Sequence, residues 1–313
     1  MAILIICQGL GPERYDKSLR ALAPGADIRL WPDHGEKEDI RYALAWNPPE
    51  GELATYPNLE VIFSAGAGVE HLLEDPALPD LPIVRLVDAN LTMRMSEYVT
   101  LHVLLHHRRM LEYGAQQRAK EWRLLDQPAA EEVRVGVMGL GELGRDSALK
   151  LGALGFKVAG WSRTAKRIEG IEGFAGADGL DGFLARTDIL AALMPLTGET
   201  AGILNAALFA KLARGGALPG PVLINAGRGG LQAEADILAA LEEGTLWAAS
   251  LDVFETEPLP GTSPLWSHPR VVITPHNASI SEGPAVAGYM LEGIALHERG
   301  EPLRNLVDKA RGY

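Results

Sequence analysis

A glycine motif between a predicted strand and a predicted helix constrains the fold of this chain more than any other feature. The motif is Gly139-Leu140-Gly141-Glu142-Leu143-Gly144. The apolar run at residues 133–138 is typical of a buried parallel strand, residues 146–154 favour a helix, and residues 156–161 favour a second strand. A strand, glycine turn, helix and strand in this order bind a dinucleotide, with its pyrophosphate at the helix N-terminus.

The flanking segments matter because 35 of the 313 residues are glycine, and a glycine triple therefore arises readily by chance. A purely structural glycine turn is the alternative interpretation. The strand before the motif and the helix after it favour the cofactor site, in which residues 139–144 contact the dinucleotide.

The end of the second strand predicts which dinucleotide is bound. An NAD site usually places Asp or Glu there for the ribose hydroxyls, but this chain has Ser162, followed by Arg163 and Thr164. No carboxylate repels a 2′-phosphate at this position, and Arg163, with Lys166 or Arg167, can pair with one. We therefore expect NADPH to be preferred over NADH. The alternative is that these cations form a solvated surface.

Three charged residues follow apolar, strand-like runs in the second half of the chain: Arg228, Glu257 and His276. Arg228 offers a planar donor fork for a carboxylate or a keto oxygen. His276 can exchange a proton with the oxygen of a ketone or alcohol, and a neighbouring Glu257 favours the imidazolium form. No side chain supplies a hydride, so a reduction at this site needs the predicted cofactor.

A colinear set of motifs resembles the D-2-hydroxyacid dehydrogenases, and within them the bacterial glyoxylate/hydroxypyruvate reductases of type A. Besides the glycine motif, the family motifs are residues 195–200, 225–229, 252–254, 257–258 and 274–276. The likeness to the subgroup lies in residues 46–49, 65–69, 161–164, 264–270 and 310–313. The resemblance implies NADPH-dependent reduction of small 2-oxo acids, of glyoxylate to glycolate and of hydroxypyruvate to glycerate.

The resemblance also implies a role for each matching residue. Arg228 binds the substrate, His276 is the acid/base, and Glu257 keeps His276 protonated. Asp252 contacts the nicotinamide carboxamide. The other residues implied are Pro195, Ala226 and Gly227 for the cofactor, and Trp46, Gly66, Ala67 and Gly68 for the substrate.

Two departures from the family pattern and several alternatives remain open. Glu70 stands where relatives commonly have Asp, and residues 212–221 are unusually long and rich in Gly and Pro. A 2-hydroxyacid dehydrogenase that uses NADH is one alternative, and a dinucleotide-sensing corepressor or scaffold is another. Formate oxidation is disfavoured because those relatives pair the histidine with Gln. Phosphoglycerate dehydrogenase is disfavoured because it favours NAD and often carries extra regulatory sequence.

The order of apolar runs predicts an α/β protein with two doubly wound parallel-sheet domains and the site in the cleft between them. The expected substrate-binding domain is flavodoxin-like and covers residues 1–100 and 283–313, and the expected dinucleotide-binding domain covers residues 101–282. We expect one long helix at residues 92–117, which crosses between the domains, and a returning helix at residues 284–298.

Composition excludes other classes of function. The net charge of -12 gives no general basic surface for nucleic acid. The sequence contains no run of eighteen apolar residues, so we expect no membrane span. We expect a cytoplasmic protein and, from the resemblance, a homodimer. The single cysteine, Cys7, fits a buried strand thiol. His102 and His106 have the i, i+4 spacing of a metal pair without the H-E-x-x-H pattern, so we predict no metal.

Overall fold

The computed structural model describes residues 2–312 and divides into two compact units. The first runs to Leu91 and resumes at Ile280, and the second spans Thr92–Ser279. Tyr313, the last residue of the terminal segment that resembles the reductases, lies outside the described residues. Within residues 2–312, no helix has the length and apolarity needed to cross a membrane.

The first unit holds a five-stranded parallel sheet in the order β2-β1-β3-β4-β5, the doubly wound order of flavodoxin-like domains. Its strands are β1 (Ala2–Cys7), β2 (Asp27–Leu30), β3 (Ile40–Trp46), β4 (Val61–Ser64) and β5 (Ile83–Val84). All six residues of β1 are buried, as expected for a central parallel strand covered on both faces. Burial raises the pKa of the Cys7 thiol to about 12, so this cysteine is not a nucleophile.

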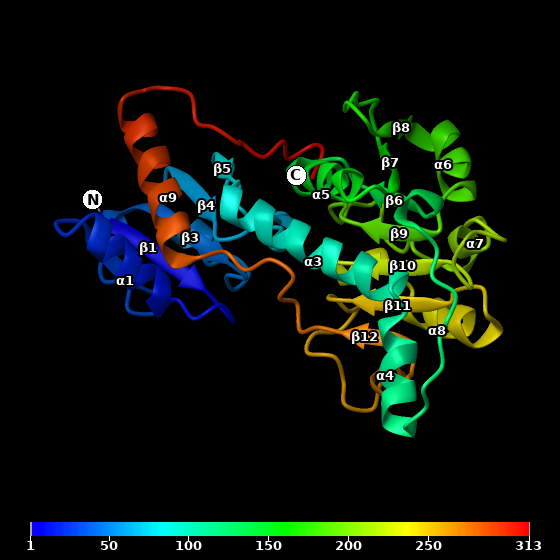
Figure 1. Ribbon diagram of the computed structural model, residues 1–313. Helices are drawn as coiled ribbons and strands as arrows, with labels where there is room; N and C mark the ends of the chain where they lie inside the picture. The colour runs from blue at the N-terminus through cyan, green and yellow to red at the C-terminus, as the bar shows by residue number, and fades with distance from the viewer. Residues whose placement is uncertain (1, 313) are drawn as a thin grey trace. The chain divides into compact units, whose positions relative to one another are not determined.

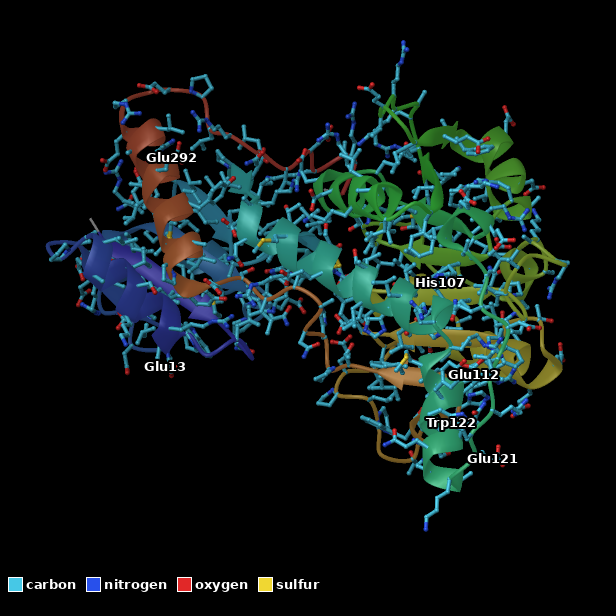
Figure 2. The ribbon with its side chains drawn as sticks, viewed as in Figure 1. Glu13, His107, Glu112, Glu121, Trp122 and Glu292 are labelled. Carbon is cyan, nitrogen blue, oxygen red and sulfur yellow. The ribbon has the colours of Figure 1, made fainter. Side chains whose placement is uncertain are left out.

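Three α-helices lie entirely within the described residues of the first unit: α1 (Glu13–Leu22), α2 (Glu70–Leu73) and α9 (Gly283–Glu298). Figure 2 labels Glu13 at the start of α1 and Glu292 on α9. The helix α9 approaches its neighbours closely at two glycines. A Cβ on Gly283 would lie 2.7 Å from the carbonyl oxygen of Arg14 in α1, and one on Gly293 would lie 2.5 Å from the Phe63 ring. These contacts join the returning segment to the first half of the unit.

The second unit holds a seven-stranded parallel sheet in the order β12-β11-β10-β9-β6-β7-β8, and Figure 1 shows most of these strands in succession. Its strands are β6 (Arg134–Met138), β7 (Lys157–Ser162), β8 (Glu172–Ala175), β9 (Ile189–Ala192), β10 (Val222–Asn225), β11 (Ala248–Leu251) and β12 (Val271–Ile273). The strand order reverses between β6 and β9, where dinucleotide-binding sheets of this kind hold their cofactor. Both sheets confirm the predicted fold class.

Two hydrophobic clusters cover opposite faces of this sheet, because successive strand residues point to opposite sides. Leu190 and Ala192 pack in one cluster, whereas Ile189 and Ala191 pack in the other. The first cluster includes residues of α6 (Gly176–Ala185), α7 (Ala206–Phe209) and α8 (Glu234–Glu243). The second includes residues of α3 (Ala89–His107) and α5 (Glu142–Ala153). The sheet is therefore a middle layer with helices on both faces.

The prediction of one helix over residues 92–117 is wrong. Two helices occupy this stretch, α3 and α4 (Met110–Ala119), and Arg109 between them has a left-handed φ of 58°. The Arg109 guanidinium pairs with Glu112 in the first turn of α4, which stabilises the break. Neither Pro nor Gly stands at residues 108–109, so the sequence carries no ordinary signal for it.

The unusual segment at residues 212–221 is tied to the sheet at several points. Ala213 N donates to Thr187 O at 3.1 Å, and Trp247 N donates to Pro221 O at 2.7 Å. Gly216 lies so close to the buried Asp188 that a Cβ there would be 2.1 Å from Oδ1. Arg134 holds the same carboxylate through its Nε and Nη2. The extra length therefore packs against β6 and β9 and leads directly into β10.

Candidate active site

The three predicted catalytic residues follow three neighbouring strands. Arg228 follows β10, Glu257 follows β11 and His276 follows β12, and these strands are adjacent and parallel in the sheet. The carboxyl ends of parallel strands meet at one edge, where open α/β sheets place their ligands. The topology therefore brings the three segments to the same edge of the second unit.

His276 and Glu257 form a direct pair, with Nδ1 2.7 Å from Oε2. Glu257 Oε1 accepts a second bond from the backbone N of Phe254 at 3.0 Å. Burial works to raise the pKa of Glu257, but the bonds from His276 and Phe254 and the charge of Arg228 outweigh it, so the net shift is downward. The group is a carboxylate at neutral pH. Because it engages Nδ1, the Nε2 atom of His276 is the ring nitrogen left for a bound ligand.

Arg228 is anchored through its backbone and its side chain. Its carbonyl oxygen accepts from Asn225 Nδ2 at 3.1 Å, and its Nη1 donates to Gly227 O at 2.7 Å. Asn225 Nδ2 also donates to Gln232 Oε1 at 2.8 Å, and Gln232 Nε2 donates to Val253 O at 2.9 Å. This buried amide pair connects the loop of Arg228 with the segment that leads to Glu257.

Asp252 organises the loop that carries His276. Its carboxylate accepts from Thr274 Oγ1 at 2.6 Å, Asn277 N at 2.9 Å and Ala278 N at 2.9 Å. Its carbonyl oxygen accepts from His276 N at 2.8 Å. A carboxylate offers about four lone-pair positions, and three are used within the protein. The predicted contact between Asp252 and the nicotinamide stays a prediction.

The glycine motif forms the expected turn into α5. Gly139 has a φ of 103°, and a Cβ on Gly144 would lie 1.8 Å from Gly139 O, so only glycine allows this close approach. Gly141 caps α5, and a Cβ there would meet no atom within 4 Å. The first turn of α5, which begins at Glu142 and Leu143, therefore opens onto free space, the arrangement that receives a phosphate group. Leu140 packs in the core.

Ser162 is the last residue of β7, the second strand of the unit along the chain, and Arg163 and Thr164 follow it. Ser162 is buried, and its Oγ donates to Thr164 O at 2.8 Å. Arg163 is exposed. Lys166 donates from Nζ to Leu140 O at 2.7 Å, so it braces the glycine motif. The residues present fit a phosphorylated ribose, because no carboxylate stands at the strand end.

The remaining predicted cofactor residues follow the neighbouring strands β9 and β10. Pro195 O accepts from Thr200 Oγ1 at 2.8 Å, which closes the loop after β9. Ala226 N donates to Ala192 O at 3.3 Å, and a Cβ on Gly227 would lie 3.0 Å from Met194 O. The segments of Pro195 and Gly227 therefore lie next to each other.

The predicted substrate residues of the first unit also form one local group. Trp46 ends β3, and its ring lies 4.3 Å from the His71 ring between centroids. A Cβ on Gly66 would lie 2.5 Å from the Trp46 indole, so glycine permits their contact. Ser64 Oγ donates to Gly68 O at 3.0 Å and closes the turn that contains Ala67.

Sequence reasoning missed Gln232, which bonds to Asn225 and to Val253 O. It named Lys166 only as a possible partner of a 2′-phosphate, whereas the Lys166 side chain donates to Leu140 O. A single sequence carries no signal for such supporting contacts. His102 Nδ1 and His106 Nε2 each lie 2.8 Å from Ser250 Oγ, so the histidine pair packs α3 onto β11. Among residues 2–312, no three His, Cys, Asp or Glu side chains are grouped to hold a metal ion.

Comparison with known proteins agrees with this geometry. The model of the D-isomer specific 2-hydroxyacid dehydrogenase NAD binding domain matches residues 100–278. A glyoxylate/hydroxypyruvate reductase A of Serratia proteamaculans is 42% identical over 307 residues, which cover 96% of each chain.

Solved structures match over the whole chain. The NADPH-dependent glyoxylate/hydroxypyruvate reductase of Sinorhizobium meliloti, in complex with NADP and sulfate, is 48% identical with a TM-score of 0.95 and covers 100% of both chains. A probable 2-hydroxyacid dehydrogenase of Rhizobium etli, in complex with NADP, HEPES and L(+)-tartaric acid, is 49% identical with a TM-score of 0.94, covering 100% of this chain and 99% of that one. The present chain belongs to the D-isomer specific 2-hydroxyacid dehydrogenase family.

Proposed function

We propose that this protein is an NADPH-dependent reductase of small 2-oxo acids, which converts glyoxylate to glycolate and hydroxypyruvate to glycerate. The observation that carries the proposal is the pair of His276 and Glu257, 2.7 Å apart, which follow β12 and β11 at the same sheet edge as Arg228 after β10. The relatives in the family support it, since they include NADPH-dependent glyoxylate/hydroxypyruvate reductases.

The chemistry divides among the three side chains. Arg228 is permanently charged and holds the substrate carboxylate and keto oxygen. His276 gives the proton from Nε2 to that oxygen, while Glu257 on Nδ1 fixes the ring and stabilises the imidazolium. When bound, the nicotinamide cofactor supplies the hydride, which no side chain can provide.

The proposed cofactor site consists of the glycine motif with the start of α5, the end of β7, and the loops after β9 and β10. NADPH is preferred because Ser162 stands where NAD sites place a carboxylate, and Arg163 follows it. The complexes of the two solved relatives with NADP support this choice. Asp252 in the cofactor site, and Trp46 with Gly66, Ala67 and Gly68 in substrate binding, complete the proposed set.

Initial rates of NADPH and NADH oxidation with glyoxylate, hydroxypyruvate and pyruvate test the function. We expect turnover with NADPH on the first two acids. A preference for NADH would overturn the cofactor assignment alone. Absence of turnover with both cofactors and all three acids would contradict the reductase and favour a dinucleotide-sensing role.

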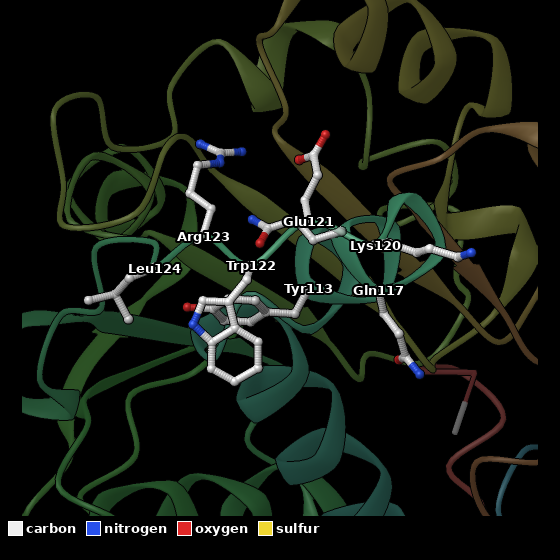
Figure 3. A pocket seen from close by; sticks show the side chains of 8 residues that line it. Tyr113, Gln117, Lys120, Glu121, Trp122, Arg123 and Leu124 are labelled. Carbon is white, nitrogen blue, oxygen red and sulfur yellow. The ribbon is translucent and has the colours of Figure 1, made fainter.

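We also propose a cytoplasmic homodimer, and the surface after α4 supports the second copy as partner. Trp122 and Leu124 are 103% and 90% exposed, and they line a cavity of about 510 Å³ with Tyr113 (Figure 3). Large apolar side chains gathered on a surface mark protein contacts. Analytical ultracentrifugation is expected to give twice the chain mass of 33.6 kDa, and Trp122→Glu is expected to give the monomer. A monomeric wild-type protein would contradict the dimer.

A further inference from the structure

The backbone of His276 is held in a conformation that a non-glycine residue seldom adopts. Its φ is 50°, in the left-handed region, where a side chain meets its own backbone. Such a conformation persists at a functional site only when the surroundings fix it firmly. The contacts that fix the backbone of His276 therefore control where its imidazole points.

Those contacts converge on one buried residue, Asp252. Its carbonyl oxygen holds His276 N, and its carboxylate holds Asn277 N and Ala278 N. Three successive backbone amides are thus bound to a single residue of the loop after β11. Asp252 is only 1% exposed, so any rotation of its carboxylate would break the bonds to Asn277 N and Ala278 N without compensation from water.

Two hydroxyl groups extend the hydrogen-bond network from the Asp252 carboxylate to α3. Thr274 Oγ1 lies 2.6 Å from Asp252 Oδ1, and Tyr98 Oη lies 2.9 Å from Thr274 Oγ1. A carboxylate only accepts, so Thr274 donates its one proton to Asp252. Thr274 must then accept from the Tyr98 hydroxyl. Burial raises the pKa of Tyr98, which keeps that proton in place.

Tyr98 itself has a fixed position on α3. It is 8% exposed, and its ring lies 4.1 Å from the His102 ring at an interplanar angle of 36°. His102 Nδ1 bonds to Ser250 Oγ at 2.8 Å, and Ser250 lies on β11 two residues before Asp252. These contacts with His102 and β11 hold the Tyr98 hydroxyl next to Thr274.

We propose that Tyr98 and Thr274 are positioning residues of this site, which act through Asp252 to hold His276 in its reactive geometry. The inference rests on the proposed reductase function and adds residues that touch neither substrate nor reacting atoms. A packing role alone would make the two hydroxyl groups matter for stability but not for turnover.

Single and double removal of the hydroxyl groups separates the two roles. Tyr98→Phe keeps the ring against His102, and Thr274→Val keeps the branched shape. We expect each to lower kcat with glyoxylate about 10-fold while KM for NADPH stays within about twofold. The double variant is expected to match the worse single one, because both hydroxyls act in one chain. Thr274→Ser restores the hydroxyl and is expected to recover kcat.

Thr187→Val is the matched control, since Thr187 is fully buried and its Oγ1 donates to Phe183 O at 2.7 Å, away from the His276 loop. It is expected to lose stability and keep kcat. Thermal denaturation verifies that each variant folds. If Thr274→Val fails to fold, the single variants Tyr98→Phe and Thr274→Ser still distinguish a positioning role from a packing role.

Amide hydrogen exchange gives a second measurement that needs no turnover. We expect faster exchange at Asn277 and Ala278 in Tyr98→Phe than in the wild type and Thr187→Val. If the wild type reduces no 2-oxo acid, this measurement still tests the clamp, and only the proposed function fails. Unchanged exchange in Tyr98→Phe, or faster exchange with unchanged kcat in an active enzyme, would overturn the inference.

Discussion

His276 Nδ1 lies 2.7 Å from Glu257 Oε2 although the two residues follow different strands and are nineteen positions apart. The side chains are 42% and 35% exposed, so the pair sits at an open edge of the sheet and not in its core. A charged hydrogen bond in such a place stabilises the imidazolium and stays accessible to a substrate.

Replacement of Glu257 by Gln is expected to lower kcat for glyoxylate reduction about 10-fold at neutral pH, since a hydrogen bond to a charged group contributes about 1.5 kcal/mol. Initial rates at saturating NADPH and glyoxylate check this. Glu255→Gln is the control, since that carboxylate binds Glu234 N instead. Equal kcat in wild type and Glu257→Gln would refute the role.

The same substitution has a predicted signature in stability. The folded pKa of Glu257 is lowered from its ordinary 4.5, so the carboxylate stabilises the fold above that value and loses this effect as the pH falls through the folded pKa. The free energy of unfolding of the wild type should therefore exceed that of Glu257→Gln near neutrality, and the gap should close in acid. Urea denaturation across pH measures it, and a gap independent of pH would contradict the linkage.

The cofactor preference should depend on the end of β7. Ser162→Asp combined with Arg163→Ala introduces a carboxylate for the ribose hydroxyls and removes a cation from the 2′-phosphate. We expect the NADPH/NADH ratio of kcat/KM to fall roughly 100-fold, equivalent to about 3 kcal/mol. Lys157→Ala at the start of β7 is the control. An unchanged ratio in the double variant would show that another segment selects the cofactor.

Two glycines of the motif should respond differently to alanine. Gly141→Ala adds a Cβ in open space, with an allowed φ of -71°, so Tm should stay the same while the Kd of NADPH rises at least about 10-fold. Gly144→Ala places the Cβ against Gly139 O and should lower the free energy of unfolding by about 2 kcal/mol. Fluorescence titration with NADPH and thermal melting distinguish them. If Gly141→Ala binds NADPH with the affinity of the wild type, the pyrophosphate does not bind at this turn.

The histidines of α3 should make the fold sensitive to acid. Burial lowers the pKa of His106 from 6.5 to about 3, and burial, partly offset by the Asp252 charge, lowers that of His102 to about 4. Below pH 6.5 the two histidines bind protons in the unfolded chain but stay neutral in the folded one. The free energy of unfolding therefore falls as the pH drops from 6.5 toward 4. His106→Gln retains a partner for Ser250 without titrating. Its unfolding free energy should fall less steeply over this range, and an equal slope would contradict the argument.

Much of the fold was predictable because its signals are local. Parallel strands covered on both faces are continuous apolar runs, and residues just beyond them lie at the carboxyl edge of the sheet. Strands such as β4 and β10 match their runs, and Arg228, Glu257 and His276 could be located just beyond strands from the sequence. The three were proposed as catalytic because the reaction needs these residue types.

The rest depends on contacts that sequence patterns do not contain. The break at Arg109 arises from a left-handed residue without Pro or Gly. The strand β8, Glu172–Ala175, was not predicted because two of its four residues are Glu and Gly, and it is an edge strand beside β7. Tyr98 and Thr274 are 176 positions apart, so only the fold reveals their hydrogen bond.

The most direct test of the proposed mechanism is the turnover number of His276→Asn with NADPH and glyoxylate, measured with the Kd of NADPH. Asn tolerates the left-handed φ of 50°, so the variant removes the imidazole and leaves the loop in place. We expect kcat to fall about 1000-fold with unchanged NADPH binding, as for loss of a general acid. A kcat near that of the wild type would contradict the assignment of His276 as the proton donor.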